Sequence, residues 1–460
     1  MEIFKRKWSE LSGCRFDPLY LLYGSQAFLK NTNFSIKTLG SVIQSIKTGF
    51  AAGKNDQSDS TKGIIQIRPT NLDENGILKF EKNIYIPRGV SSEHLITKGE
   101  VLFNNTNSQE LVGKTAYFDL EGNFVSSNHI TRIKTDIEQL LPQYLSILLN
   151  IYQKNKVFFN TCVNWNNQSG INIEFLKSYV IPLPPLETQQ HIIDIMDNAY
   201  SLKKQKEQEA KELLDSIDKY LLDELGITLP NPQTHLQNRI WTAKFSELSG
   251  ARFDPSYHQN YYKQLELALE NGKYPTKKLK AILDVNLVLE DTDKYDYINY
   301  IDLSCINKIT ATIENIKRID NNFPSRARQK VSCGDLLVSS LGGSIKSIAI
   351  VNVGSKNLIA STGFFVIKNI EGLDKNFLMY ILRTSIFQTL LERETSGAIM
   401  PSISRDNFLN LKIPLPPLAI QEKIAEEIQK RKQKALKLTE EAKELLEQAK
   451  KQVESMILGG

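Results

Sequence analysis

The chain has 460 residues, of which 41% are hydrophobic and 24% charged, and this ordinary globular composition argues against a disordered chain. At about 100–200 residues per domain, this length predicts two to four domains. No apolar run approaches the roughly 20 residues that a membrane-spanning helix needs, and no signal-peptide core follows the N-terminus. The four cysteines (Cys14, Cys162, Cys305 and Cys333) form no CxxC pair, which argues against a disulfide scaffold or zinc cluster. These features predict a soluble, cytoplasmic protein.

Basic residues are in excess in two large segments. Residues 1–185 hold 20 Lys and Arg against 16 Asp and Glu, and residues 231–417 hold 23 against 18. Residues 186–230, which lie between these segments, are acidic, with 5 basic against 10 acidic residues. The basic excess is compatible with a phosphate backbone as partner, but it does not require one.

The sequence contains an internal repeat, which is the first feature to seek because it decides the architecture. Residues 9–20 (SELSGCRFDPLY) recur at 246–257 (SELSGARFDPSY), with 10 of 12 positions identical. The run Ile181-Pro-Leu-Pro-Pro-Leu186 recurs unchanged at 413–418. Each half of the chain is therefore expected to be a globular segment of about 180 residues followed by a charged helix.

Both charged segments have the period of a long helix. Each follows a Pro-Pro pair and runs without Pro or Gly for about 40 residues. From Ile424 to Met456, seam positions alternate spacings of four and three, and subtracting 232 gives the same register from Ile192 to Glu224. The matching registers predict an intramolecular antiparallel coiled coil, since each helix would leave one globular segment and reach the other. The alternative is that each helix packs on its own domain.

The globular segments are rich in short β-branched or aromatic runs separated by Gly, Asn and Ser. The predicted strands are 63–68, 99–103, 114–118, 335–338, 347–353 and 363–368. Helices are expected at Gln143–Tyr152 and Lys375–Glu394. The predicted fold class is α+β, with two β-rich domains, two long antiparallel coiled-coil helices and an internal pseudo-two-fold repeat.

Catalytic motifs are not found in this sequence. Gly113-Lys114-Thr115 resembles the end of a phosphate loop, but Ser108 stands where the first glycine is required. There is no GxGxxG, and no Asn/Asp-Pro-Pro-aromatic run that would hold a target amino group. The five histidines show no metal-ligand spacing. We therefore expect no catalytic site, no metal site and no bound cofactor on this chain.

Polar loops interleaved with aromatic residues and Gly are the remaining candidates for function. Asn and Gln can bond adenine bidentately in the major groove, and Arg can bond guanine in the same way. The alternative is that these are ordinary Asn-rich loops. The candidate DNA-binding residues are Arg68, Thr70, Asn71, Asn104, Asn105, Asn128, His129, Asn164, Trp165, Asn166, Asn167, Gln168, Arg326, Arg328, Ser339, Ser340, Lys346, Ser402, Ser404 and Arg405.

The duplicated motifs resemble the specificity subunit of a type I restriction-modification system. The resemblance is carried by Ser-Glu-Leu-Ser-Gly-x-Arg-Phe-Asp-Pro at the start of each half and by Pro-Leu-Pro-Pro-Leu-x-x-Gln before each long helix, with Gln189 and Gln421 at the expected place. It covers the whole chain. The resemblance implies target recognition domains at 1–185 and 244–417, spacer helices at 186–226 and 418–458, and a linker at 227–243.

The resemblance also implies a function in phage defence. Each recognition domain would read one half of a bipartite, asymmetric sequence in double-stranded DNA. The helices would set the spacer and dock two methyltransferase (modification) subunits, which would bring S-adenosylmethionine for DNA methylation. Restriction/translocase subunits would bring ATP and Mg²⁺. The alternatives are a structural coiled-coil adaptor, or the specificity subunit of a related type II or other phage-defence system.

Overall fold

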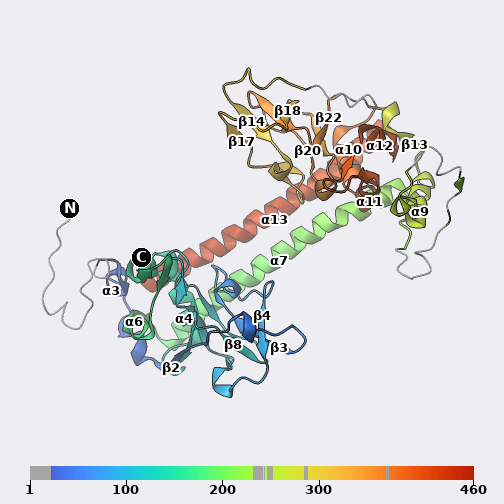
Figure 1. Ribbon diagram of the computed structural model, residues 1–460. Coiled ribbons are helices and arrows are strands. Elements are labelled where there is room, and N and C mark those ends of the chain that lie inside the picture. Colours follow the sequence, from blue (N-terminus) through green and yellow to red (C-terminus); the bar gives the residue numbers. More distant parts are fainter. Residues whose placement is uncertain are drawn as a thin grey trace. The chain divides into compact units, whose positions relative to one another are not determined.

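The computed structural model describes residues 22–231, 242, 244–245, 252–283, 289–368, 370 and 372–459. The chain divides into two compact units (Figure 1). Unit 1 comprises Met1–Gln205 with Glu441–Gly460, and unit 2 comprises Lys206–Glu440. Each unit is therefore built from both long helices, because α7 (Leu186–Leu225) and α13 (Leu418–Leu458) each contribute a part to either unit.

Unit 1 contains several small sheets. The largest has the strand order β2-β9-β5-β7 and is antiparallel throughout, and a second sheet has the order β4-β3-β8 with a parallel β3–β8 pair. A third has the order β10-β11-β6, and β1 pairs with β12. The strands are β1 (Ser35–Thr38), β2 (Ile43–Thr48), β3 (Gly63–Ile67), β4 (Ile84–Pro87), β5 (Val101–Asn104), β6 (Thr106–Asn107), β7 (Thr115–Tyr117), β8 (Phe124–Ser126), β9 (Ile130–Thr135), β10 (Val163–Trp165), β11 (Gln168–Gly170) and β12 (Val180–Leu183).

The core of unit 1 lies where its helices cover the main sheet. The helices are α3 (Ser25–Phe28), α4 (Pro142–Lys154), α5 (Val157–Thr161) and α6 (Ile173–Ser178), followed by the start of α7. Helix α4 packs on β5 and β7. Its apolar face, with Leu145, Leu148 and Tyr152, joins Phe103 and Phe158 in one cluster of buried residues. This burial is the main source of the unit's stability.

Unit 2 repeats this plan with different sheets. Its strand orders are β17-β14-β21-β18 and β20-β19-β22, with the pairs β15–β16, β23–β24 and β13–β25. The strands are β13 (Thr276–Lys278), β14 (Ile298–Ile301), β15 (Ile306–Asn307), β16 (Thr312–Ile313), β17 (Lys317–Ile319), β18 (Ala327–Lys330), β19 (Leu336–Ser339), β20 (Ile348–Ile350), β21 (Leu358–Ser361), β22 (Phe364–Ile367), β23 (Thr395–Ser396), β24 (Ser402–Ile403) and β25 (Lys412–Pro414). The helices are α9 (Asn260–Glu270), α10 (Lys375–Leu382), α11 (Ser385–Glu394), α12 (Arg405–Asn410) and the start of α13.

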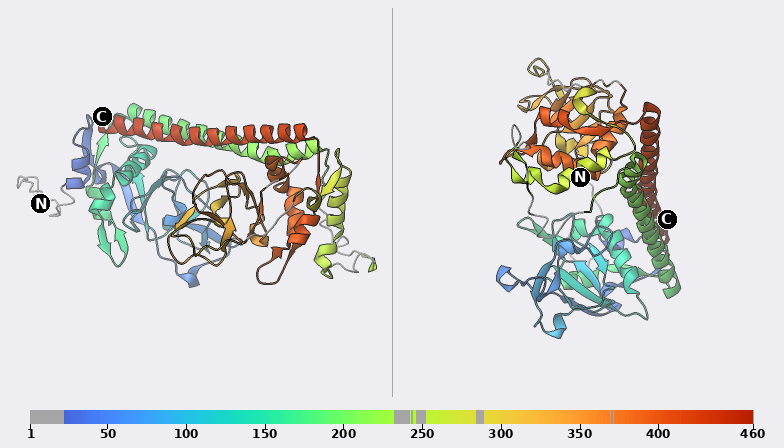
Figure 2. Two further views of the ribbon diagram at one scale, coloured as in Figure 1. Left: turned by 90° about the horizontal axis from the view of Figure 1, so that it is seen from above. Right: turned by 90° about the vertical axis from the view of Figure 1, so that its right-hand side faces the viewer.

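The two long helices pair in an antiparallel direction, as the sequence predicts. Within unit 2, Lys434 Nζ lies 3.0 Å from Glu209 Oε1, and the Arg431 guanidinium lies 4.3 Å from the ring centroid of Tyr220. Residue numbers thus fall along α13 as they rise along α7 (Figure 2). Within unit 1, both helices contribute to one apolar core through Ile192, Ile193, Met196, Ala199, Leu446, Ala449, Val453 and Ile457. The predicted α+β class, long helices and internal repeat are confirmed.

One buried glutamine makes the same bonds in each copy of the Pro-Leu-Pro-Pro-Leu-x-x-Gln motif. Gln189 Oε1 accepts from the Leu141 N–H (2.9 Å), and Gln421 Oε1 accepts from the Asp374 N–H (2.8 Å). Each Nε2 donates to the carbonyl five residues earlier, of Pro184 or Pro416 (2.9 and 2.8 Å). Both side chains are fully buried. The motif therefore ties the start of a long helix to the residue just before α4 or α10.

Two expectations are modified by the structure. The single helix predicted at Lys375–Glu394 is two helices, α10 and α11, because the chain turns at Arg383 and Thr384. At the end of α13, Ile457 is buried and Met456 is only partly buried, so the apolar stripe is shifted there by one residue from the predicted seam. The first SELSG motif lies outside the described residues, and so does the start of the second.

Candidate nucleic-acid interface

An exposed hairpin in unit 1 carries most of the predicted polar cluster at 164–168. Strands β10 and β11 pair with Trp165 opposite Gln168, and all residues from Val163 to Gln168 are exposed. Asn166 and Asn167 form the turn with φ values of 38° and 64°. Tight hairpin turns favour Asn at such left-handed positions. The sequence thus places two amides at the hairpin tip.

Trp165 lies across the hairpin and leaves part of its ring accessible. A Cβ added at Gly170 would lie 2.4 Å from Trp165 Cη2, so only glycine accommodates the indole there. Trp165 is 45% exposed. The neighbouring Asn164 Oδ1 accepts a 2.6 Å bond from Ser169 Oγ, which fixes the hairpin from within. The exposed indole can stack on a base or contact a thymine methyl group.

Five predicted residues lie around one concave surface, which we call the recognition hollow. It has a volume of about 600 Å³ and is lined by Arg68, Pro69, Thr70, Lys82, Asn83, Ile84, Thr106, Asn107, Ser108, His129, Asn167 and Gln168. The hollow forms because β11 pairs with β6, which brings the hairpin beside Thr106 and Asn107. Segments far apart in sequence thereby supply amide, hydroxyl and cationic groups to one surface, a donor and acceptor set suited to base edges and phosphates.

Several predicted residues are instead buried behind this surface. Asn71 Nδ2 donates to the Lys79 carbonyl (2.8 Å), Asn104 Nδ2 to the Leu111 carbonyl (3.1 Å) and Asn105 Nδ2 to Thr131 Oγ1 (2.8 Å). Their side chains hold the loops of the hollow in place. Direct base contact by these three amides stays a prediction, and it would require them to exchange intramolecular bonds for bonds to DNA.

The side chain of Arg68 makes several hydrogen bonds within the chain, whereas Asn128 is bonded through its backbone carbonyl. The Arg68 guanidinium donates from Nε and Nη2 to Gln66 Oε1 (3.0 and 2.8 Å) and from Nη2 to the Ala52 carbonyl (3.2 Å). Arg68 therefore lines the hollow in a fixed orientation. Asn128 is exposed, while its carbonyl accepts from Asn105 Nδ2 at 3.2 Å.

Unit 2 has a corresponding hairpin with an apolar tip. Strands β23 and β24 pair directly before α12, as β10 and β11 do before α6. At the tip, Ile399 is 96% exposed and Met400 is 50% exposed. Arg326 is exposed beside them, with Nη2 3.5 Å from Met400 Sδ. An exposed apolar tip next to a cation fits thymine methyl contact combined with a phosphate bond.

The other predicted residues of unit 2 fall into exposed and buried groups. Exposed or partly exposed are Arg328, Lys346, Ser402, Ser404 and Arg405. Ser404 Oγ caps α12 by accepting from the Asn407 N–H (3.1 Å). Ser339 and Ser340 are buried, and Ser340 Oγ donates to the Gly363 carbonyl at 2.9 Å. The structure thus groups Arg326 with the hairpin tip, whereas the two buried serines lie at the end of β19 and directly after it.

Sequence reasoning missed residues that the structure adds to both surfaces. Lys82, Asn83, Asn107 and Ser108 line the recognition hollow, although none of the four is among the candidate residues named from the sequence. Ile399 and Met400 form the tip of the second hairpin. An apolar tip carries none of the amide, hydroxyl and cationic groups that predict base contact from a sequence. The exposed turn that holds these two residues could have been recognised from Gly397 and Pro401 at its ends.

Clusters of metal-ligating residues and membrane-spanning helices are both missing from the described part of the chain. No group of three or more His, Cys, Asp or Glu residues there is placed to hold a metal ion. Among the described helices, none is both long and apolar enough to cross a membrane.

Comparison with known proteins identifies both halves of the chain. The family model described as "Type I restriction modification DNA specificity domain" matches residues 31–212 and again residues 266–448. Two curated relatives come from Methanocaldococcus jannaschii. The "Putative type I restriction enzyme MjaX specificity subunit" is 24% identical over 93% of either chain, and the "Type I restriction enzyme MjaVIII specificity subunit" is 23% identical over 84% of this chain and 86% of that protein.

A solved structure shares the fold. It is described as "Structural basis underlying complex assembly and conformational transition of the type I R-M system". The TM-score is 0.54 at 16% sequence identity, and the match covers 92% of this chain and 97% of that one.

Proposed function

The chain belongs to the family of type I restriction-modification DNA specificity proteins, and from this premise we propose that it reads one split, asymmetric DNA target with one half-site for each unit. As a specificity subunit, it supplies DNA recognition to a restriction-modification complex, with DNA and other subunits of that complex as partners. The observation that supports one half-site for each unit is that both units present an exposed hairpin before a capped helix, with different side chains at the tip.

In unit 1, we propose that recognition combines the hairpin with the recognition hollow. Asn167 and Gln168 are exposed amides that can bond adenine through its N6 and N7. Lys82 is exposed on the same surface and can bond a phosphate. Trp165 adds an apolar face for a base. This combination positions the backbone and reads the base edges from one side of the unit.

In unit 2, the proposed recognition relies more on shape and cations. Ile399 and Met400 would contact thymine methyl groups or the edge of a base step. Arg328 is exposed on the edge strand β18, and Arg326 is exposed directly before that strand. Both can bond phosphate or guanine. Because the two tips differ in chemistry, the two half-sites should differ in sequence.

The chemistry of the complex is assigned to other subunits in this proposal. Two methyltransferase subunits would dock on the long helices and bring S-adenosylmethionine, and restriction/translocase subunits would bring ATP and Mg²⁺. This chain would be non-catalytic and would bind no cofactor. We expect the purified chain alone to leave DNA unmethylated.

The test is to map methylated adenine across a host genome with and without this chain. One strain carries the chain with its cognate methyltransferase, and the matched strain lacks only this chain. We expect one split, asymmetric motif to be methylated in the first strain alone. A third strain, with residues 1–185 exchanged for those of another family member, should change one half-site and keep the other. An unchanged methylome, with the system expressed, would contradict the proposal.

A further inference from the structure

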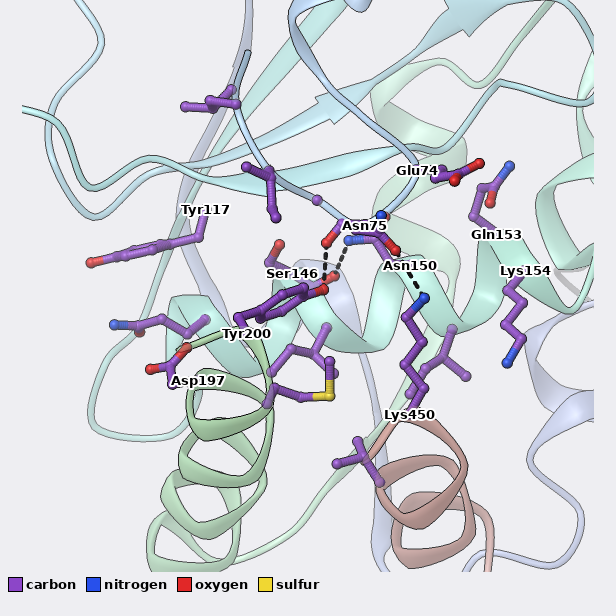
Figure 3. A pocket seen from close by; sticks show the side chains of 18 of the residues that line it. Glu74, Asn75, Tyr117, Ser146, Asn150, Gln153, Lys154, Asp197, Tyr200 and Lys450 are labelled. Carbon is purple, nitrogen blue, oxygen red and sulfur yellow. Dashed lines mark hydrogen bonds between the residues drawn. The ribbon is translucent and has the colours of Figure 1, made fainter. Parts of the chain in front are cut away.

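Unit 1 contains a pocket that the proposed DNA surfaces do not use. It has a volume of about 620 Å³, within the usual range for ligand sites, and lies between the loop at 74–80, α4, the first part of α7 and the last part of α13 (Figure 3). Ile147, Met196 and Val453 are among its apolar lining residues. Tyr200 spans one wall, where its hydroxyl donates to the Asn75 carbonyl at 2.8 Å.

One side of this pocket is acidic and aromatic. Asp119 is one of its lining residues. Asp197 lies beside Tyr117 and Tyr200, and Glu74 lies on the loop opposite (Figure 3). Burial, followed by the charges of Asp194 and Asp119, raises the pKa of Asp197, so a cation beside it would be stabilised. In the described part of the chain, no ion pair within 4 Å joins Asp119 or Asp197 to a cation of this protein.

The two lysines of the pocket are already paired with other carboxylates. Lys450 Nζ lies 2.7 Å from Glu447 Oε1, and it also donates to Asn75 Oδ1 at 2.8 Å. Lys154 Nζ lies 3.6 Å from Glu454 Oε2. The acidic wall therefore has an unmatched negative charge, and carboxylates beside aromatic faces attract guanidinium and ammonium groups.

Unit 2 shows what occupies the corresponding place in the other half of the repeat. The bonds of the two motif glutamines align Leu141 with Asp374, so an offset of 233 places Asn150 at Arg383 and Ile147 at Tyr380. Along the long helices the offset is 232, which places Tyr200 at Lys432. Three pocket-lining residues of unit 1 thus correspond to Arg383, Tyr380 and Lys432 in unit 2.

In unit 2 these positions are filled by cations from the chain itself. Arg383 Nη2 donates to the carbonyls of Lys308 and Ile309 (2.6 and 3.2 Å), and its Nη1 donates to Lys346 and Ile348 (2.9 and 3.3 Å). Lys432 Nζ lies 5.4 Å from the ring centroid of Tyr380. Lys432 is buried and Arg383 is half-buried, and both charges are tolerated because an aromatic face and backbone carbonyls lie against them.

We propose that the pocket of unit 1 binds the guanidinium or ammonium side chain of a basic segment from the modification subunit. This side chain from the partner would place a cation in the pocket of unit 1, as Arg383 and Lys432 place cations at the corresponding site of unit 2. The inference rests on the proposed function, because it takes the modification subunit as partner. One consequence is that two copies of that subunit meet unequal surfaces: one open acidic pocket and one site that is already filled.

The first test fills the pocket from within. Asn150→Arg places in unit 1 the side chain that unit 2 has at the corresponding position, and Asn123→Arg makes the same change at an exposed residue outside the pocket. The affinity of each full-length variant for the cognate modification subunit is measured at low and moderate salt, with thermal unfolding as a check on folding. We expect about tenfold or greater weakening for Asn150→Arg alone.

A second pair of variants keeps the inference testable if Asn150→Arg does not fold. Glu74→Lys reverses a charge at an exposed pocket residue, and Glu138→Lys makes the same reversal at an exposed residue elsewhere in unit 1. Glu74→Lys should weaken binding of the modification subunit about tenfold, and the affinity of this variant should depend less on salt than that of the unchanged chain. The affinity of Glu138→Lys should stay within about twofold of that of the unchanged chain.

The outcomes separate this inference from the proposed function. Binding within twofold for Glu74→Lys and for a folded Asn150→Arg would overturn the pocket inference, even if the unchanged chain directs methylation of a split motif. Equal weakening by Glu74→Lys and Glu138→Lys would also overturn it, because the effect would then be general electrostatics. If the unchanged chain directs no methylation, the proposed function itself fails.

Discussion

Units 1 and 2 share a framework of strands, helices and buried hydrogen bonds, but they differ in the side chains at the hairpin tip and at one internal site. The motif glutamines make matching bonds, β1–β12 matches β13–β25, and a capped helix follows each hairpin. The hairpin tip is polar in unit 1 and apolar in unit 2. The place beside α4 is an open pocket, whereas cations fill the place beside α10. The repeat thus maintains the scaffold and leaves the exposed tips and one internal site free to diverge.

The largest expected effect tests the shared framework. Gln189→Ala and Gln421→Ala each remove a buried side chain and leave one backbone N–H and two carbonyls without their bonds. Each substitution should lower the free energy of unfolding by about 2–4 kcal/mol, because unsatisfied buried polar groups are costly. Denaturant unfolding measures this, with exposed Gln190→Ala as control. A much larger loss at one glutamine than at the other would show that the framework is not equivalent in the two units.

The next prediction concerns Lys432, which fills in unit 2 the site that is an open pocket in unit 1. Burial, helped by Arg383, lowers the pKa of Lys432 to about 8. Between pH 8 and the ordinary pKa of lysine, the unfolded chain holds a proton that the folded chain has released, so the free energy of unfolding rises with pH in this range. Below pH 8, Lys432 is charged in the folded chain, and the full free-energy cost of burying that charge is present. Lys432→Met should therefore raise the free energy of unfolding by about 1–3 kcal/mol at pH 7, and the gain should shrink as pH rises through this window.

This prediction is checked by thermal unfolding of Lys432→Met and the unchanged chain at pH 7 and pH 10. Exposed Lys430→Met is the matched control and should change stability by less than about 0.5 kcal/mol at both pH values. A destabilised Lys432→Met variant at pH 7 would mean that the contact with Tyr380 outweighs the burial of the charge.

A recognition variant tests whether the two tips read different half-sites. Gln168→Ala should cost about 1–3 kcal/mol of discrimination at one base pair of one half-site, since it removes one pair of base bonds. Arg326→Ala should affect only the other half-site. The measurement is the methylated motif, or binding to a panel of single-base variants. Relaxation of both half-sites by either substitution would contradict the assignment of one half-site to each unit.

The smallest effect concerns the helix that follows each hairpin. Asn172 Oδ1 accepts from the Phe175 N–H (2.8 Å) at the start of α6, as Ser404 Oγ does for α12. Alanine at either position should cost about 1 kcal/mol of stability, measured by denaturant unfolding. A loss of DNA affinity larger than this loss of stability would indicate that Ser404 also contacts DNA, as the sequence predicted, rather than acting only as a cap.

The sequence predicted the long helices and the repeat well because their signals are local. Pro-Pro pairs end the preceding strand, and apolar spacings of three and four identify the helix. The turn at Arg383 was missed because no Gly or Pro marks it. The burial of Asn71, Asn104 and Asn105 could not be predicted, since a loop amide has the same sequence signature whether it bonds a carbonyl or faces solvent. The pocket was also inaccessible, because its walls come from segments that only the fold brings together.

The way in which unit 1 uses both ends of the chain has a consequence for biosynthesis. Its core includes Leu446, Val453 and Ile457, whereas unit 2 is continuous from Lys206 to Glu440. At about 5–20 residues per second, the ribosome needs about 12–47 seconds to add the stretch that separates the two parts of unit 1. The unit that is synthesised first should therefore be the last to close its core. Translation that stalls or ends early would therefore leave a chain whose N-terminal half still exposes apolar surface to chaperones.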